Sequence, residues 1–196
     1  MQALSKITGG MIPSSSTYRL NHKVSDGPVS GQEFKANLQP RFDKLAGRDQ
    51  QPDICYRAAV HAARAGNAIT KDAEKALNEG KNYPPSYLKL MGISEQSKRL
   101  DFNSTDIPES GFLNFHSATE GRLVHTAYVH RDPDGRLLLA HNNGLSLDRE
   151  LGMPERTGGV NVHDITTGHD GDINRYLSTN KLSFHYSPAS EVNGRA

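Results

Sequence analysis

The sequence predicts an α+β domain in which helices precede an antiparallel β-sheet along the chain. Helical periodicity and an alanine-rich run occupy the first half. Short apolar segments, two of them joined by a tight turn, occupy the second half. No internal repeat is visible, and the length of 196 residues suits one domain. We therefore expect a single domain at residues 31–196, preceded by a disordered tail at residues 1–30.

Periodicity and capping signals place the helices of the first half. Helices are expected at residues 32–45, 54–65 and 69–80, with a short helical turn at 86–91. The second of these segments is alanine-rich and therefore strongly helical. Asp53 is placed to cap its beginning and Gly66 to end it.

Alternation and turn residues place the strands of the second half. Strands are expected at residues 112–116, 122–131, 135–141, 160–165 and 181–186, with one further helix at 170–179. The sequence Asp132-Pro133-Asp134-Gly135 is typical of a tight hairpin turn between the second and third strands. The N-terminal helices are thus expected to pack on a C-terminal antiparallel sheet.

Charge and cysteine content exclude several classes of function. The chain has 23 basic and 22 acidic residues and no basic stripe, so we expect no nucleic-acid partner. One cysteine allows no internal disulfide and no multi-cysteine zinc site, and it favours a reducing compartment. No apolar run approaches 18 residues, so we expect no transmembrane segment. We expect neither a metal nor a cofactor.

The N-terminus lacks the charged and then apolar pattern of a classical signal peptide. Its serine- and threonine-rich composition resembles the export signals of bacterial type III effectors. That resemblance implies secretion into the cytoplasm of a host cell, with a secretion chaperone bound to the tail. The alternative is an ordinary disordered terminus.

Cys55 is a candidate nucleophile because it falls in the first turn of the helix expected at 54–65. The partial positive charge of a helix N-terminus favours a thiolate, which is the reactive form of cysteine. The alternative is a buried structural cysteine.

His125 is the candidate general base because it begins an apolar strand. A histidine held on a strand could take the thiol proton and later protonate a leaving group. The next strand brings a polar residue alongside, either His141 or Asn142, which could orient the imidazole. The alternative is a surface hairpin with solvated histidines. We expect four other histidines to be bystanders, namely His61, His130, His163 and His185.

A helical cysteine, a strand histidine and a polar residue on the partner strand, in that order, resemble the papain-like cysteine proteases. The local sequences HTAYV at 125–129 and HNNG at 141–144 are similar to the YopT/AvrPphB family of bacterial type III effector proteases. The resemblance covers roughly residues 50–186. It implies a papain-like fold and a thiol protease that acts in virulence.

The chain departs from that family at the third catalytic position, where Ala140 replaces an aspartate. In a strand, Ala140 and Asn142 share one face while His141 points to the other. We therefore prefer Asn142 as the orienting residue and keep His141 as the alternative. Gln50, five residues before Cys55, is the candidate for stabilising the oxyanion, as the resemblance implies.

Three functions follow from these residues. The first is a cysteine-nucleophile hydrolase, either a protease or a glutamine deamidase, acting on a host protein. The second is an NAD-dependent ADP-ribosyltransferase, because the chain carries Arg19, Ser117 and Glu150 in the order found in such toxins. The third is a non-catalytic binding module on a papain-like fold, which Ala140 favours.

Overall fold

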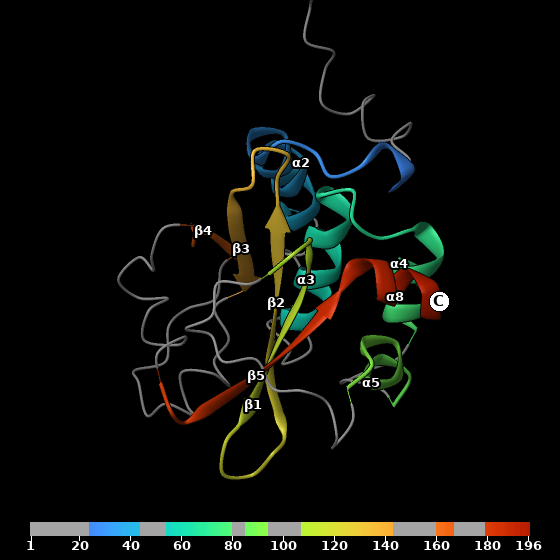
Figure 1. Ribbon diagram of the computed structural model, residues 1–196. Coiled ribbons are helices and arrows are strands. Elements are labelled where there is room, and N and C mark those ends of the chain that lie inside the picture. The colour runs from blue at the N-terminus through green and yellow to red at the C-terminus, as the bar shows by residue number, and fades with distance from the viewer. Residues whose placement is uncertain (1–23, 44–53, 80–84, 94–106, 143–159, 167–178) are drawn as a thin grey trace, which may run out of the picture.

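The computed structural model describes residues 24–43, 54–79, 85–93, 107–142, 160–166 and 179–196 (Figure 1). The helical elements are η1 (Val24–Asp26), α2 (Gly31–Asp43), α3 (Ile54–Ala65), α4 (Lys71–Asn78), α5 (Pro85–Met91) and α8 (Ala189–Arg195). The strands are β1 (Gly111–Ser117), β2 (Leu123–Arg131), β3 (Leu137–Asn142), β4 (Val160–Asp164) and β5 (Leu182–Pro188). The chain is a mixed α+β protein.

The five strands form one sheet in the order β4-β3-β2-β1-β5, and every neighbouring pair is antiparallel. The predicted helices at 32–45, 54–65 and 69–80 and the predicted strands are confirmed within a few residues. The helix expected at 170–179 lies almost wholly outside the described residues. Helix α8, by contrast, was not predicted; it begins directly after the last strand.

All the longer described helices pack on one side of the sheet, which we call the helix face. Their apolar side chains form a buried core with Phe112, Tyr128, Leu138 and Ala140 of the central strands. Helix α3 lies across β2 and β3 (Figure 1). The opposite side, which we call the far face, carries a second buried cluster that includes Leu113, Phe115, Ala127, Val129 and Leu139.

The pairing between β1 and β2 contains one irregularity, near the beginning of β2. Phe115 pairs with His125, but the next residue of β1, His116, pairs with Leu123. Val124 is therefore an extra residue on β2, which is the definition of a β-bulge.

The segment before α2 is bound to the sheet, although residues 1–30 were expected to be a tail. Val29 is buried, and its carbonyl oxygen accepts a hydrogen bond of 2.8 Å from His130 Nε2. The His130 ring also stacks on Phe34 of α2, with the ring centroids 4.4 Å apart. Residues 24–30 therefore belong to the folded domain, and the tail boundary expected at residue 30 lies too late.

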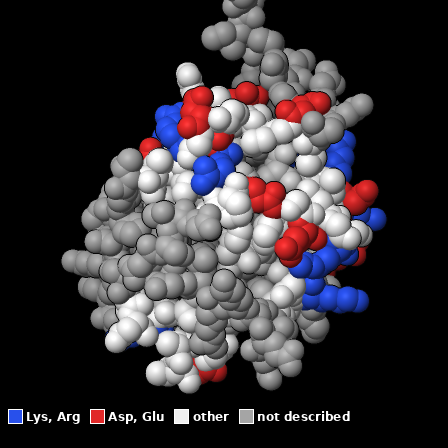
Figure 2. Space-filling model, viewed as in Figure 1, with Lys and Arg blue, Asp and Glu red and all other residues white. Residues whose placement is uncertain are grey.

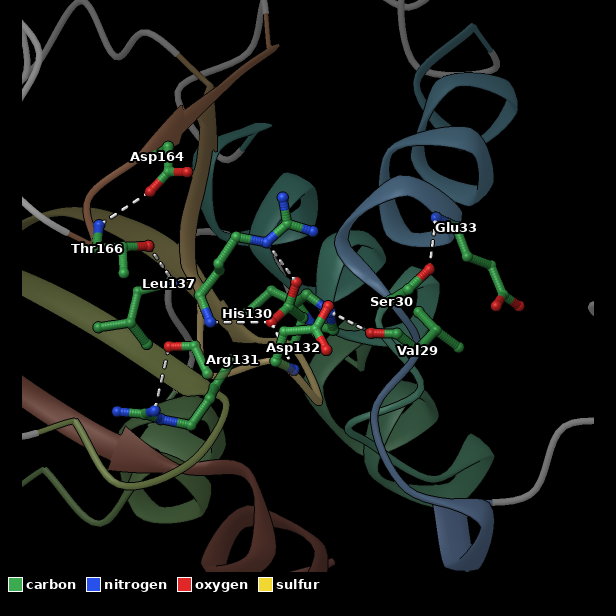
Figure 3. Close-up of polar contacts among 12 residues, drawn as sticks. Val29, Ser30, Glu33, His130, Arg131, Asp132, Leu137, Asp164 and Thr166 are labelled. Carbon is green, nitrogen blue, oxygen red and sulfur yellow. Dashed lines mark hydrogen bonds and ion pairs between the residues drawn. The ribbon is translucent and has the colours of Figure 1, made fainter.

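One carboxylate closes the hairpin between β2 and β3 (Figure 3). Asp132 Oδ1 accepts hydrogen bonds from the backbone amides of Asp134 and Arg136, and Oδ2 accepts one from Arg136 Nε at 2.9 Å. These contacts outweigh the effect of burial and lower the pKa of Asp132. The turn predicted at 132–135 is confirmed, with Gly135 at a φ of 84°.

Candidate active site

Cys55 is the second residue of α3, and the residue is 4% exposed. Tyr87 of α5 lies close enough to interact with it electrostatically. Burial raises the pKa of Tyr87 above its ordinary value; the hydrogen bond to Thr126 opposes this rise, and the charge of Cys55 adds to it. Cys55 therefore lies on the helix face, near the phenol of Tyr87.

A buried network of polar side chains ties α5 to the sheet beside Cys55. Tyr87 Oη lies 3.1 Å from both Asn114 Oδ1 and Thr126 Oγ1, and Thr126 Oγ1 donates to Asn114 Oδ1 at 3.0 Å. Asn114 Nδ2 donates to Ser187 Oγ, which donates to the carbonyl oxygen of Met91. These bonds satisfy groups that would otherwise be costly to bury.

Two histidines share the helix face with this network. His116 lies two residues beyond Asn114 on β1, and His185 lies directly opposite Asn114 on β5. Their ring centroids are 4.5 Å apart. His116 Nδ1 is 3.2 Å from the carbonyl oxygen of Gly121. His185 was expected to be a bystander. Its position beside Asn114 and His116 was not predictable from the sequence, because it depends on the register of β1 with β5.

His125 points to the far face, away from α3. Its side chain is fully buried, and its ring packs edge-on against Phe115 and His141 at centroid distances of 5.3 and 5.5 Å. Its immediate neighbour Thr126 points to the helix face and contacts Tyr87. Because successive residues of a strand point to opposite faces, Cys55 and His125 lie on opposite sides of the sheet. The structure does not bring this predicted pair together.

As expected, Ala140 and Asn142 share one face of β3 and His141 lies on the other. The face that carries His125, however, is the one with His141. Ala140 belongs to the helix-face core, so Asn142 shares that face, while His141 lies beside His125 on the far face. Asn142 is therefore not the neighbour of His125, and His141 is. Gln50 lies outside the described residues.

Of the three residues of the ADP-ribosyltransferase alternative, the structure describes only Ser117. Ser117 Oγ lies 3.1 Å from Thr119 Oγ1 and accepts a hydrogen bond from the amide of Glu120, as expected of a turn residue. Arg19 and Glu150 lie outside the described residues. Within the ranges that the structure describes, no group of three or more histidine, cysteine and acidic side chains is placed to hold a metal ion.

Residues 34–196 match the family described as a domain of unknown function, DUF8038. The chain belongs to the DUF8038 family. No curated protein and no solved structure gives a significant match. Family membership therefore assigns no activity to this DUF8038 chain, and the function has to be argued from its own residues.

A second feature is an open groove of about 290 Å³ at the other end of the molecule. It is lined by residues that follow α3, precede β1 and end β2, among them Asn67, Ser110 and Arg131.

On the face shown in Figure 2, the described acidic and basic side chains are interspersed, and neither sign forms a patch of its own. None of the described helices is long and apolar enough to cross a membrane.

Proposed function

We propose that this DUF8038 chain is a cysteine-nucleophile hydrolase, a protease or a glutamine deamidase, with Cys55 as its nucleophile. The observation that carries the proposal is the location of Cys55. It lies in the first turn of α3, on the same face of the sheet as His116 and His185. A helix N-terminus and a neighbouring imidazole are the two features that favour a thiolate.

The chemistry is acyl transfer from an amide. A histidine takes the proton of the Cys55 thiol, and the thiolate attacks the amide carbonyl carbon to give a tetrahedral intermediate. The carbon–nitrogen bond then breaks, and the nitrogen leaves as an amine or ammonia with the proton from the histidine. Water hydrolyses the thioester and releases the carboxylate. Protease and deamidase share these steps and differ only in which amide is bound.

The sequence resemblance to effector proteases extends the proposal. It supports a papain-like arrangement, a host protein as substrate and delivery through a type III system, with the N-terminal residues bound by a secretion chaperone on the way. Each of these points depends on the resemblance and is separate from the geometry at Cys55.

Alkylation of Cys55 by iodoacetamide tests the proposal. We expect the native protein at pH 7 to react about tenfold faster than the urea-unfolded chain, because the helix N-terminus and the histidine raise the thiolate fraction. Cys55→Ser is the control and should incorporate no label. A native rate slower than that of the unfolded chain would contradict the proposal, because it would show a protected structural thiol.

A non-catalytic binding module is the second candidate. The observation that favours it is the separation of Cys55 from His125, together with Ala140 at the position where a catalytic acid is expected. The two candidates differ in one outcome. If Cys55→Ala leaves every effect of the protein on cells intact while the native thiol is protected, the binding module is correct.

A further inference from the structure

We infer that His116, held by the carbonyl of Gly121, is the general base that takes the proton of Cys55. This inference rests on the proposed hydrolase function and assigns a base that is not among the residues predicted from the sequence. It follows from three independent features of the structure: the face on which His116 lies, the end of the sheet at which it lies, and the tautomer that its hydrogen bond imposes.

The face is fixed by the contacts of β1. Asn114 accepts a hydrogen bond from Tyr87 of α5, so it points to the helix face. His116 is two residues further along β1 and points the same way. Phe115, between them, points to the far face and contacts His125. His116 therefore lies on the side of the sheet that carries Cys55, whereas His125 does not.

The direction of α3 shows which end of the sheet Cys55 lies against. Gly66, directly after α3, lies against the end of β2, since a Cβ on Gly66 would be 2.7 Å from His130 Nδ1. Cys55 is eleven residues earlier, which is about 16 Å along a helix, the length of about five strand residues. Tyr87, which interacts electrostatically with Cys55, contacts Asn114 of β1 and Thr126 of β2, so Cys55 lies near this part of the two strands. His116 is there too, because it pairs with Leu123.

The tautomer follows from the partner of Nδ1. A carbonyl oxygen only accepts, so the contact of His116 Nδ1 with Gly121 O places the proton of the neutral ring on Nδ1. Nε2 then carries the lone pair that a general base requires. When Nε2 takes the thiol proton, the hydrogen bond to Gly121 stabilises the imidazolium. A backbone carbonyl thereby takes the role of the orienting side chain, and Ala140 is no obstacle to catalysis.

The Gly121 carbonyl is itself held in place by the turn between β1 and β2. The amide of Gly121 donates to the Ser117 carbonyl at 2.8 Å, and the Ser117 amide donates to the Arg122 carbonyl at 2.9 Å. Gly121 has a φ of 68°, a conformation that favours glycine. The ring of His185 packs against that of His116, with the centroids 4.5 Å apart.

The pH dependence of iodoacetamide alkylation tests the inference in the full chain. We expect the wild-type rate to titrate with a midpoint below the value of about 8.5 for a free thiol. His116→Gln should move the midpoint up to about that value and lower the rate at pH 7 about tenfold. His125→Phe, the matched control on the far face, should leave the midpoint unchanged.

The outcomes separate this inference from the proposed function. A reactive thiol whose midpoint responds to His185→Gln or His125→Phe, but not to His116→Gln, overturns the role of His116 and leaves the hydrolase standing. A wild-type thiol that is protected overturns both.

A measurement on the wild-type protein covers the case in which His116→Gln does not fold. The imidazole Cε1 proton of His116 is titrated by NMR before and after Cys55 is blocked as its methyl disulfide. Removing a neighbouring thiolate lowers the pKa of a histidine, so the His116 titration should shift downward and that of His125 should not. An unchanged His116 titration overturns the inference.

Discussion

Burial keeps the His125 ring neutral. The side chain is fully buried between Phe115 and His141, and this burial lowers the pKa of His125 to about 3. In the unfolded chain the same ring titrates near its ordinary value of about 6.5. Between these two values the unfolded state binds a proton that the native state does not, so the free energy of unfolding falls as the pH falls from about 6.5 towards 3.

We predict that His125→Phe makes the protein less sensitive to acid. His125 removes about 1.4 kcal/mol of stability for each pH unit below about 6.5, so the wild type should lose about 2 kcal/mol more than the variant between pH 7 and pH 5. Phenylalanine does not titrate and fills a similar volume. Urea unfolding at both pH values gives the comparison. Equal losses in the two proteins would show that His125 titrates normally in the native state.

At the candidate site, the positions of single residues were predictable from the sequence only in part. The place of Cys55 in the first turn of a helix was predictable from the alanine-rich run that follows it, and α3 confirms it. The location of His125 on a strand was predictable as well. The face to which His125 points was not, because it depends on contacts with β1 and α5, elements distant in sequence.

Helix α4 begins with a capping interaction that links two distant segments. Thr70 Oγ1 accepts a hydrogen bond from the amide of Ala73, and the amide of Thr70 donates to Asn193 Oδ1 of α8. Asn193 Nδ2 in turn donates to the carbonyl of Ala68. The beginning of α4 is therefore fixed both by its own cap and by α8. Threonine is a residue type that favours N-caps, whereas the short, polar sequence of α8 lacks a clear helical period.

We predict that Thr70→Ala lowers the free energy of unfolding by about 1 kcal/mol, the usual cost of losing a side-chain cap. Thr70→Ser is the matched control, because it keeps the hydroxyl and should cost much less. Both changes leave the backbone bond to Asn193 in place. Urea unfolding measures the difference. An alanine variant as stable as the serine variant would mean that Asn193 alone fixes the beginning of α4.

At the scale of the whole molecule, the segment that precedes α2 connects two parts of the fold. Val29 is buried and His130 donates to its carbonyl oxygen, while Asn67 Nδ2 donates to the Gly27 carbonyl at 2.9 Å. Residues 24–30 thus bridge the end of β2 and the turn after α3. The α+β class was predictable from the order of patterns along the chain. This bridge was not, because residues 24–30 show no periodicity.

We predict that a chain beginning at residue 31 melts several degrees lower than one beginning at residue 24. The shorter chain loses the burial of Val29 and leaves His130 Nε2–H without its acceptor, and an unsatisfied buried donor costs about 1–3 kcal/mol. Thermal unfolding of the two chains, followed by circular dichroism at one protein concentration, measures the difference. Equal melting temperatures would show that residues 24–30 contribute nothing to stability.

The extra residue in β2 has a consequence for how this family could diverge. Leu123 and His125 keep their partners on β1 on either side of Val124, so the ladder is already regular without it. A relative lacking this residue would retain every cross-strand pair and lose only the apolar contact of Val124 with the far-face cluster. Alignments of DUF8038 chains should therefore tolerate a one-residue gap at this point, whereas a gap within 125–131 would exchange the two faces of the strand.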